Sequence, residues 1–595
     1  MSIEYNKKEP LKEICHDTDL CVVGGGMAGM IAAISAARHG AKVLLMQDRP
    51  VLGGNASSEI RMWIRGCRGK NNQETGILEE IFLDNMYRNP ERNYSIWDSI
   101  LYEKVKNEPN ITLLLNTACM DLTMKENRIQ SVRGFQLTTY TFHTVTARYF
   151  ADCSGDSILA PLSGAIYRVG REGSSEFGED IGPSVEDRKT MGMSCLIQAR
   201  ETGRPVKFVP PSWAAQFDDE DMLKFRDHDL SSCYTNFWWM ELGGNQDSIH
   251  DTEEVRDELL KIAFGVWDHI KNRGDHGADC WELEWVGFLP GKRESRRYVG
   301  DYIMTQNDVR SEGKFEDMVA YGGWPMDDHN PDGFLHKGEP TIFHPAPAPF
   351  GIPYRCLYSK NIENLFFAGR NISVTHAALS STRVMGTCSL LGQAVGTAAA
   401  MAKKYDCTPR DIYRYHIKEL QQTLMDDDCY LPWHKRDVGE LTQKAILTAS
   451  EGDPEVLRNG IDRPVKEEDN GWYGKIGSFV EYRFEKPVLI TRCRLVFDSD
   501  LERESCSGHL LYRTLPMLCN RFYNMEPFGF PKTMVKDFDL EYLDEEGAWR
   551  TLKKVRNNYQ RLYKIDVHVV TRAVRFIPRE TYGDSRVHVF AFDVR

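Results

Sequence analysis

No two cysteines in this chain are spaced as C-x-x-C, although 15 cysteines are scattered over its 595 residues. Structural zinc sites and iron–sulfur clusters commonly use that spacing, so its absence argues against both classes of metal site. Cysteines without a repeating framework also argue against a disulfide-stapled secreted protein. The sequence therefore predicts reduced thiols, a cytoplasmic location and no bound metal.

The chain also lacks an apolar leader, a long apolar run and net positive charge. Its first ten residues, MSIEYNKKEP, are polar, so we expect no signal peptide. No apolar run approaches the length of a membrane span. A net charge of −13 argues against nucleic acid or an anionic membrane surface as the main partner. We therefore expect a small-molecule substrate, and neither nucleic acid nor a membrane as partner.

A glycine-rich stretch, VVGGGMAGMIAAISAARHGAKVLLMQ, runs from Val22 to Gln47. Gly24, Gly26 and Gly29 occupy the glycine positions of G-x-G-x-x-G, between apolar runs at 20–23 and 42–46. This strand–turn–helix–strand order is the context that dinucleotide binding requires. In that motif the first glycine permits the turn, the second lets the backbone approach a pyrophosphate and the third lets the helix pack on the strand.

The end of the second predicted strand departs from the usual pattern. An acidic residue normally stands there and binds the ribose hydroxyls, whereas this chain has Gln47 followed by Asp48. The amide of Gln47 can hydrogen-bond a hydroxyl without charge assistance, and the Asp48 carboxylate can do so with it. Either residue is therefore a candidate ribose ligand.

Three further segments complete a pattern with the first. They are RPVLGGNASSEIR from Arg49, ADCSGD at 151–156, and NLFFAGRNISVTHAALSSTRVMGTCSLLGQAVG from Asn364. Together the four segments resemble the FAD-binding segments of two-domain flavoproteins of the glutathione-reductase type. They resemble more closely the FAD-dependent oxidoreductases, which are related to the succinate dehydrogenase and fumarate reductase flavoproteins. The resemblance covers roughly residues 17–435 and implies FAD as cofactor.

The resemblance also assigns residues to parts of FAD. It implies that Gly24, Gly26 and Gly29 hold the pyrophosphate and that Gln47 or Asp48 binds the adenosine ribose. Gly53, Gly54 and Asn55 would lie against the FAD, and Gly155 and Asp156 near its diphosphate end. Gly369 and Arg370 would lie near the ribityl chain. A helix that begins near Arg383 would point its N-terminus at the flavin, and Gly386 would let it pack closely. Cys67 is the single cysteine in the stretch GGNASSEIRMWIRGCRG that begins with the double glycine. A disulfide relay to the flavin needs a pair of cysteines there, so this mechanism is not expected.

Two segments concentrate polar groups for chemistry. In GKRESRR, Arg293 and Arg296 are candidates to bind a carboxylate or a carbonyl oxygen, with Lys292 on the solvated side. The alternative is an ordinary solvated basic turn. In SVTHAALSSTR, His376 and Arg383 precede the flavin-facing helix, so His376 is a candidate proton carrier or, alternatively, a structural histidine.

After about residue 440, alternating segments such as SFVEYRF, ITRCRLVF, KDFDLEYL and AVRFI indicate an all-β region. RNGIDRP and the following WYGKIGSFVEYRF resemble discoidin or galactose-binding-like jelly rolls. Such domains bind glycans, or serve as structural or oligomer-forming modules, so a homo-oligomer is one assembly to test. Because every cofactor motif precedes this region, we expect a chain without residues 445–595 to keep its FAD.

The predicted fold is a doubly wound α/β Rossmann-type FAD-binding domain with an inserted α+β substrate cap and a C-terminal all-β jelly-roll sandwich. The predicted boundaries are 1–156 and 346–440 for the two parts of the FAD-binding domain, 157–345 for the cap and 445–595 for the sandwich. We expect hydride transfer between flavin N5 and an alcohol carbon of a sugar, polyol or hydroxy acid. The alternatives are fumarate-reductase-like reduction of an activated C=C bond, and a glycan-binding or assembly protein without turnover. The sequence does not identify the electron acceptor.

Overall fold

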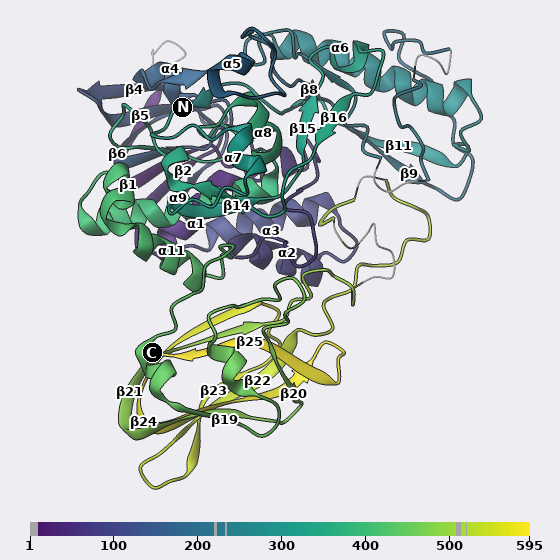
Figure 1. The fold of residues 1–595 in the computed structure, drawn as a ribbon. Helices are drawn as coiled ribbons and strands as arrows, with labels where there is room; N and C mark the ends of the chain where they lie inside the picture. The colour runs from purple at the N-terminus through teal and green to yellow at the C-terminus, as the bar shows by residue number, and fades with distance from the viewer. Residues whose placement is uncertain (1–9, 219–222, 232–234, 507–512, 514, 519) are drawn as a thin grey trace, which may run out of the picture.

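A parallel sheet organises the first part of the chain (Figure 1). Its central strand, β1 (Lys12–Val23), pairs in parallel with β2 (Val43–Met46) on one side and β6 (Thr141–Asp152) on the other. β3 (Ile111–Leu114) and β18 (Leu365–Phe367) extend it to the order β3-β2-β1-β6-β18. This is the strand order of the dinucleotide-binding fold, so the predicted Rossmann-type domain is confirmed.

The structure is a computed structural model that describes the chain except for residues 1–9, 219–222, 232–234, 507–512, 514 and 519. Every residue of β2 and β18 is buried, as expected for strands covered on both faces. β6 also pairs antiparallel with β5 (Arg128–Gln136), which pairs with β4 (Thr117–Lys125). The β-rich pattern that precedes ADCSGD is this meander, and it makes the sheet mixed.

Helices α1 (Met27–Arg38) and α9 (Met385–Tyr405) pack against each other beside the sheet. A Cβ at Gly392 would lie 2.1 Å from the carbonyl oxygen of Ala28, and one at Gly396 would lie 2.2 Å from that of Ala32. Only glycine permits this approach. The other helices of this body are α2 (Ile77–Arg88), α3 (Tyr94–Lys106), α4 (Leu159–Ser163), α8 (His376–Thr382), α10 (Pro409–Asp411), α11 (Ile417–Asp426) and α12 (Glu440–Lys444).

Between β6 and β18 the chain forms a cap of short strands and few helices. Its elements are β7 (Tyr167–Arg168), α5 (Ser174–Phe177), β8 (Met193–Ser194), β9 (Ile197–Glu201), β10 (Glu241–Leu242), α6 (Thr252–Asp268), β11 (Trp281–Val286), β12 (Gly291–Lys292), β13 (Arg297–Tyr298), α7 (Gln306–Arg310), β14 (Met318–Gly322), β15 (Met326–His329), β16 (Thr341–His344) and β17 (Phe350–Pro353). Trp239, Trp267 and Trp281 belong to its hydrophobic core.

The long helix of the cap, α6, buries the stripe that its 3.6-residue periodicity predicts, including Val255, Leu259 and Val266. Asp251, the N-cap residue, and Glu254 have the spacing of a capping box, but the Asp251 side chain does not form one. Its carboxylate instead accepts the backbone N–H of Asp247, at 3.0 Å.

The C-terminal region is the predicted all-β sandwich, and its strands pair antiparallel around one hydrophobic core. The strands are β19 (Ile446–Ala449), β20 (Trp472–Lys475), β21 (Val480–Phe497), β22 (Val535–Leu543), β23 (Trp549–Val555), β24 (Leu562–Thr581) and β25 (Arg586–Val594). The two segments predicted as separate strands at 478–484 and 490–497 belong to one strand, β21. Irregular register near Pro487 lets it continue past a residue that would otherwise end it.

The sandwich shares buried contacts with the nucleotide-binding body, beside α2 and α3 (Figure 1). Leu83 and Met86 of α2 belong to the hydrophobic core of the sandwich. Arg503 of the sandwich forms an ion pair with Glu79 of α2, and both side chains are buried. The two regions are therefore joined by packing and charge as well as by the chain.

These contacts change the result expected from truncation. Removal of residues 445–595 would expose Leu83 and Met86 and remove the ion-pair partner of Glu79. Newly exposed apolar surface of this kind favours aggregation. We now expect residues 1–444 to aggregate, as measured by size-exclusion chromatography. A monodisperse, yellow fragment would contradict this and support independent folding of the two regions.

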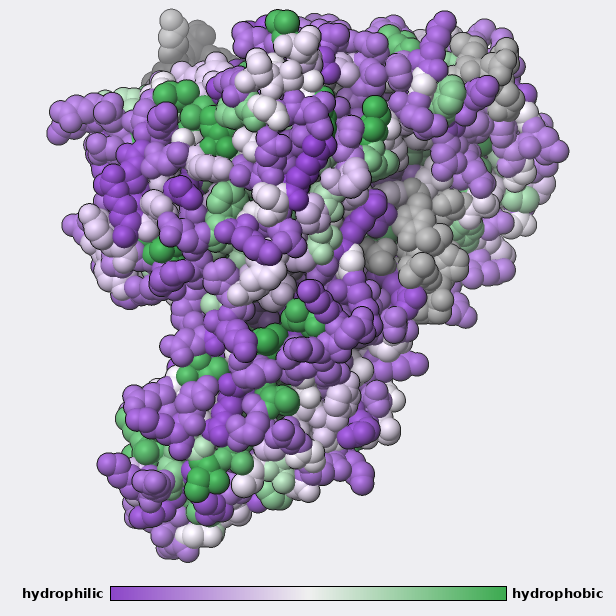
Figure 2. Space-filling view, viewed as in Figure 1, coloured by the Kyte–Doolittle hydropathy of each residue, from purple (hydrophilic) through white to green (hydrophobic). Residues whose placement is uncertain are grey.

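Hydrophilic side chains dominate the face shown in Figure 2, and hydrophobic ones form small separate groups. Among the described residues, no single helix is long and apolar enough to cross a membrane. Only the pair α8 and α9 meets the length and composition requirement together, and it is bent by 94°. Apart from the first residue and the C-terminal end of α9, the residues of both helices are buried within this protein.

Candidate functional site

The carboxyl ends of β1, β2, β6 and β18 open into one cavity of about 760 Å³. The residues that follow these strands line it, namely Gly24 and Gly26, Gln47 and Asp48, Ser154 to Asp156, and Gly369 and Arg370. Ligands of open α/β sheets bind at this edge. Four motifs far apart in the sequence therefore contribute to one site, as the resemblance implied.

The glycines at the start of α1 fit a bound pyrophosphate. Gly24 has a φ of +101°, and a Cβ there would lie 2.4 Å from the carbonyl oxygen of Cys153. At Gly26 the nearest atom to a Cβ would be Gly54 Cα, at 3.8 Å, so this backbone faces open space in the cavity. Gly26 is the N-cap of α1 and has no side chain to bond the first N–H groups. These N–H groups and the helix dipole favour an anion here.

Gly29 has a packing role. A Cβ at Gly29 would lie 1.8 Å from the carbonyl oxygen of Gly24, and Gly29 is not among the residues that line the cavity. Gly386 also lies outside the cavity lining, and a Cβ there would meet the carbonyl oxygen of Arg65 at 2.9 Å. Both predicted cofactor residues therefore shape the site by allowing backbones to approach.

The two candidate ribose ligands, Gln47 and Asp48, have different environments in the structure. Gln47 is buried, its Oε1 accepts the N–H of Gly25 at 2.7 Å, and its Nε2 donates to the carbonyl of Val51 at 3.1 Å. Asp48 lines the same end of the cavity with an exposed carboxylate. Glu59, which sequence reasoning missed, also lines this end, 3.7 Å from Arg49. Asp48 and Glu59 are therefore the acidic candidates for the ribose hydroxyls.

Asp156 is an ionised anchor in the cavity wall. Its carboxylate lies 2.9 Å from Lys292 Nζ and 2.8 Å from Arg370 Nη2. Burial alone would raise the pKa of Asp156, but Arg370, Lys292 and Ser295 lower it to about 2. Lys292 therefore lies in the cavity wall, and its predicted place on the solvated side is wrong. The alternative of a solvated basic turn is also wrong, because Arg293, Glu294 and Arg297 are buried.

Gly53, Gly54 and Asn55 line the cavity next to Gly26. The N-terminus of α9 faces it as predicted, since Val384 and Met385 line the wall and no side chain caps the helix. A helix N-terminus stabilises negative charge on a bound group.

At the cap side of the cavity, four charged side chains and a histidine form a chain of contacts. Arg293 lies 3.4 Å from Glu241, whose carboxylate lies 2.6 Å from His329 Nδ1. His329 Nε2 lies 3.2 Å from Asp327, which lies 3.1 Å from Arg383 Nη2. All except Glu241 line the cavity. Burial opposes ionisation of Glu241, but Arg293 and His329 lower its pKa on balance.

His329 was missed because no motif surrounds it. Its one sequence signal is spacing: Asp327 and His329 are two residues apart on β15 and therefore share a face of that strand. The predicted proton carrier, His376, lies outside the cavity lining. Its Nδ1 lies 2.9 Å from Glu294 and its Nε2 lies 3.3 Å from Asp328. Burial works against its charged form, yet these carboxylates raise the pKa of His376 to about 9.

Charge and unsatisfied donors make the cavity suited to anions. Eight Lys or Arg side chains line it against four Asp or Glu side chains, in a chain whose net charge is −13. Among the described residues, four donors of its lining are buried without a hydrogen-bond partner: Arg49 Nη1, Arg370 Nε, Arg383 Nε and Trp324 Nε1. Unsatisfied buried donors are rare, and a bound anion would satisfy them.

Comparison with known proteins gives short or partial matches to individual relatives. A stretch of 42 residues is 62% identical to the fumarate reductase (cytochrome) of Shewanella frigidimarina, over 7% of each chain. A longer stretch of 236 residues is 25% identical to the tRNA uridine 5-carboxymethylaminomethyl modification enzyme MnmG of Alkaliphilus metalliredigens, over 35% of this chain and 34% of the relative. The chain thus spans about a third or less of the length of these relatives.

Among solved structures, the family 32 carbohydrate-binding module of Streptococcus pneumoniae EndoD is similar at 17% identity and a TM-score of 0.20. The match covers 26% of this chain and 97% of the module. A fucose binding module from the same organism matches at 12% identity and a TM-score of 0.19, over 26% of this chain and 94% of that one.

The family described as FAD dependent oxidoreductase matches residues 19–424, which include all four cofactor motifs and the whole cap. Because this match spans more than half of the chain and the cavity fits the cofactor, the chain belongs to the FAD dependent oxidoreductase family.

Proposed function

We propose that this flavoprotein oxidises the alcohol carbon of a small hydroxy acid. The observation that carries the proposal is the contact chain Arg293–Glu241–His329–Asp327–Arg383 in the wall of a cavity with excess positive charge. Of the three substrate classes expected from the sequence, hydroxy acids alone are anionic. A carboxylate matches cationic side chains better than a neutral sugar or polyol does.

Arg383 is the residue best placed to bind the substrate carboxylate. Its Nη2 is held by Asp327, while its buried Nε has no partner within the described residues. Arg68 adds a second cation at this part of the cavity, 4.2 Å from the ring of Trp324. Arg293 serves differently, because its Nη1 donates to Ser194 Oγ and its Nη2 to the carbonyl of Trp238, each at 2.9 Å. It therefore holds Glu241 and the Trp238 segment in position.

His329 is the proposed proton carrier. Oxidation of an alcohol removes a hydride from carbon and a proton from oxygen, and bound FAD supplies the two-electron acceptor for the hydride. The proton passes to the imidazole of His329, which becomes an imidazolium. Glu241 lies 2.6 Å from Nδ1 and stabilises the imidazolium, while Nε2, whose contact with Asp327 is longer at 3.2 Å, is the nitrogen that receives the proton. This is the stabilisation that makes histidine an effective general base.

An anaerobic flavin-bleaching screen tests the proposal. The FAD-loaded protein is mixed with hydroxy acids, neutral polyols and neutral sugars of matched size, and the flavin absorbance is followed. We expect hydroxy acids to bleach the flavin fastest, and increasing salt to raise the concentration needed for half-maximal rate. Faster bleaching by neutral polyols would overturn the choice of an anionic substrate. No bleaching by any compound, together with no reoxidation of photoreduced protein by unsaturated carboxylates, would favour the glycan-binding alternative without turnover.

Reduction of an activated C=C bond is the second candidate. The same contacts favour it in one respect, because a histidine between two carboxylates can also donate a proton to carbon. The similarity to a fumarate reductase over 42 residues adds limited support. Photoreduced protein distinguishes the two reactions: reoxidation by unsaturated carboxylates, without bleaching by hydroxy acids, would replace the first proposal with this one.

A further inference from the structure

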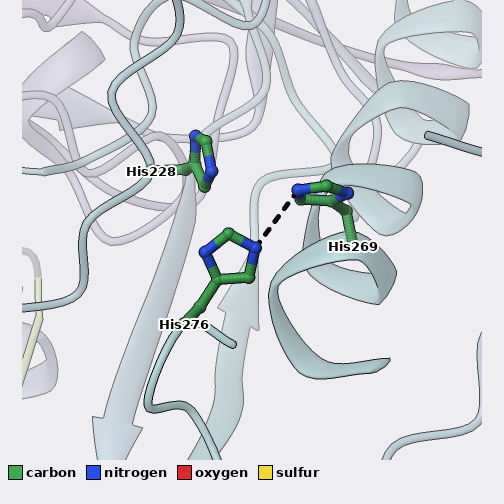
Figure 3. Close-up of side chains that lie close together, drawn as sticks. All are labelled: His228, His269 and His276. Carbon is green, nitrogen blue, oxygen red and sulfur yellow. Dashed lines mark hydrogen bonds between the residues drawn. The ribbon is translucent and has the colours of Figure 1, made fainter. Parts of the chain in front are cut away.

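Three histidines meet in the cap, away from the cavity described above. His228 comes from the segment before β10, His269 begins the turn that ends α6, and His276 lies in the loop that follows (Figure 3). One ring nitrogen from each lies within 4.8 Å of the corresponding nitrogens of the other two. None of the three lines the FAD cavity. We propose that this cluster, His228–His269–His276, binds a divalent metal ion, and specifically Zn²⁺.

Hydrogen bonds to the backbone assign the nitrogens that face the metal. His269 Nδ1 lies 2.6 Å from the carbonyl oxygen of Phe217, and His228 Nδ1 lies 2.6 Å from that of Arg226. A carbonyl oxygen only accepts, so both Nδ1 atoms carry a proton, and Nε2 is the nitrogen of each ring that would bind a metal. A hydrogen bond from the other ring nitrogen to a backbone carbonyl is usual for histidines that bind metals.

The separation of the nitrogens fits tetrahedral coordination. His269 Nε2 and His276 Nε2 lie 3.2 Å apart (Figure 3). Two ligands of a tetrahedral zinc ion at Zn–N distances of about 2.0–2.1 Å would be about 3.3 Å apart. The ligand nitrogen of His228 lies within 4.8 Å of the other two. His228 comes from a loop and is only partly buried, so its ring can adjust to the same ion.

The surroundings of the cluster include a surface cavity through which a cation could enter and an unusual helical turn. A surface cavity reaches His228 and His276 and is also lined by Asp227, Asp229, Asp275 and Glu339. Among the described residues of its lining, these carboxylates outnumber the two cations, Lys224 and Arg226, and would attract a cation. His269 begins a π-helical turn, His269–Arg273, and such turns often occur at functional sites.

Imidazole ligands select transition metals over Mg²⁺ or Ca²⁺, which prefer oxygen. Three histidines with tetrahedral spacing suit Zn²⁺, with a fourth position for another ligand or water. The metal would brace the cap segment that supports the flavin cavity. Trp239 Nε1 donates to the carbonyl of Asp227, at 2.7 Å, and the neighbouring Trp238 lines the cavity. A metal at His228 would therefore hold this wall in place.

Direct metal measurement tests the proposal on tag-free, full-length protein. Chelator-treated protein is titrated with ZnCl₂ against a chromophoric chelator, and bound zinc is quantified by mass spectrometry. We expect one zinc per chain and a higher Tm with zinc than without. His276→Gln should weaken zinc binding on the order of 100-fold, since one of three ligands is lost. FAD content serves as the folding control, because the cofactor motifs lie in other segments.

His250→Gln is the matched control. His250 is exposed and contacts Asp247 in the same cap, outside the cluster. We expect it to bind zinc like the unmodified protein. Less than one zinc per ten chains at a fivefold excess of ZnCl₂ would overturn the proposal. The proposal would also be overturned if His276→Gln and His228→Gln, both with full FAD, bound zinc as tightly as the unmodified protein does. The ion would then bind elsewhere.

Discussion

Leucine in place of Gly26 should give a folded protein that purifies without FAD. A Cβ at this position meets no atom closer than 3.8 Å, so the first carbon of the side chain does not disturb the fold. The rest of a leucine would extend into the cavity where the backbone must approach the pyrophosphate. The ratio of flavin to protein absorbance, before and after incubation with FAD, measures the effect. We expect the ratio to fall from near one flavin per chain to near zero.

Two glycine variants provide the controls. Gly26→Ala adds only the tolerated Cβ and should retain part of the FAD. Gly29→Ala should instead yield little soluble protein, because its Cβ would lie 1.8 Å from the carbonyl oxygen of Gly24. The pair thus separates loss of cofactor from loss of fold. Full FAD content in Gly26→Leu would contradict the placement of the cofactor against α1.

The cofactor site could be predicted well from the sequence because its signals are local. Gly24 and Gly26, Gly155 and Asp156, and Gly369 and Arg370 each follow an apolar strand directly. Carboxyl ends of parallel strands meet at one edge of the sheet, so each local motif also predicts its place in three dimensions. Gly29 and Gly386 show the limit of this reasoning. The sequence identifies positions where glycine lets the backbone approach another group closely, but not whether that group is a cofactor or another part of the backbone.

The substrate end could not be predicted because its contacts join distant segments. Glu241, Arg293, His329 and Arg383 come from four parts of the chain. Glu241 and His329 lie on strands of two and four residues, and Arg293 follows the two-residue strand β12. Strands that short show no periodicity. The position of His376 in the sequence, just before the flavin-facing helix, was therefore the strongest available signal for a proton carrier. In the structure, His376 lies outside the cavity lining, whereas His329 is part of it.

Asparagine in place of His329 should lower kcat/KM by about 10²–10⁴-fold while FAD content stays unchanged. The substitution removes the proposed proton acceptor but keeps a polar side chain next to Glu241 and Asp327. The limb of the pH–rate profile that reports the base should also disappear. Steady-state kinetics with the best substrate of the bleaching screen, at several pH values, measures both effects. The flavin absorbance of each preparation corrects the rate for occupancy.

His376→Asn is the matched variant, because this histidine also lies between two carboxylates but outside the cavity lining. We expect it to lower the Tm while the rate per bound flavin changes little. A pKa raised to about 9 means that charged His376 stabilises the fold fully below its ordinary pKa of 6.5. This contribution is lost as the pH rises through about 9, so the difference in Tm between the two proteins should shrink there. If His376→Asn loses activity and His329→Asn does not, the proton carrier is His376, and the contacts around His329 serve only to hold the cap.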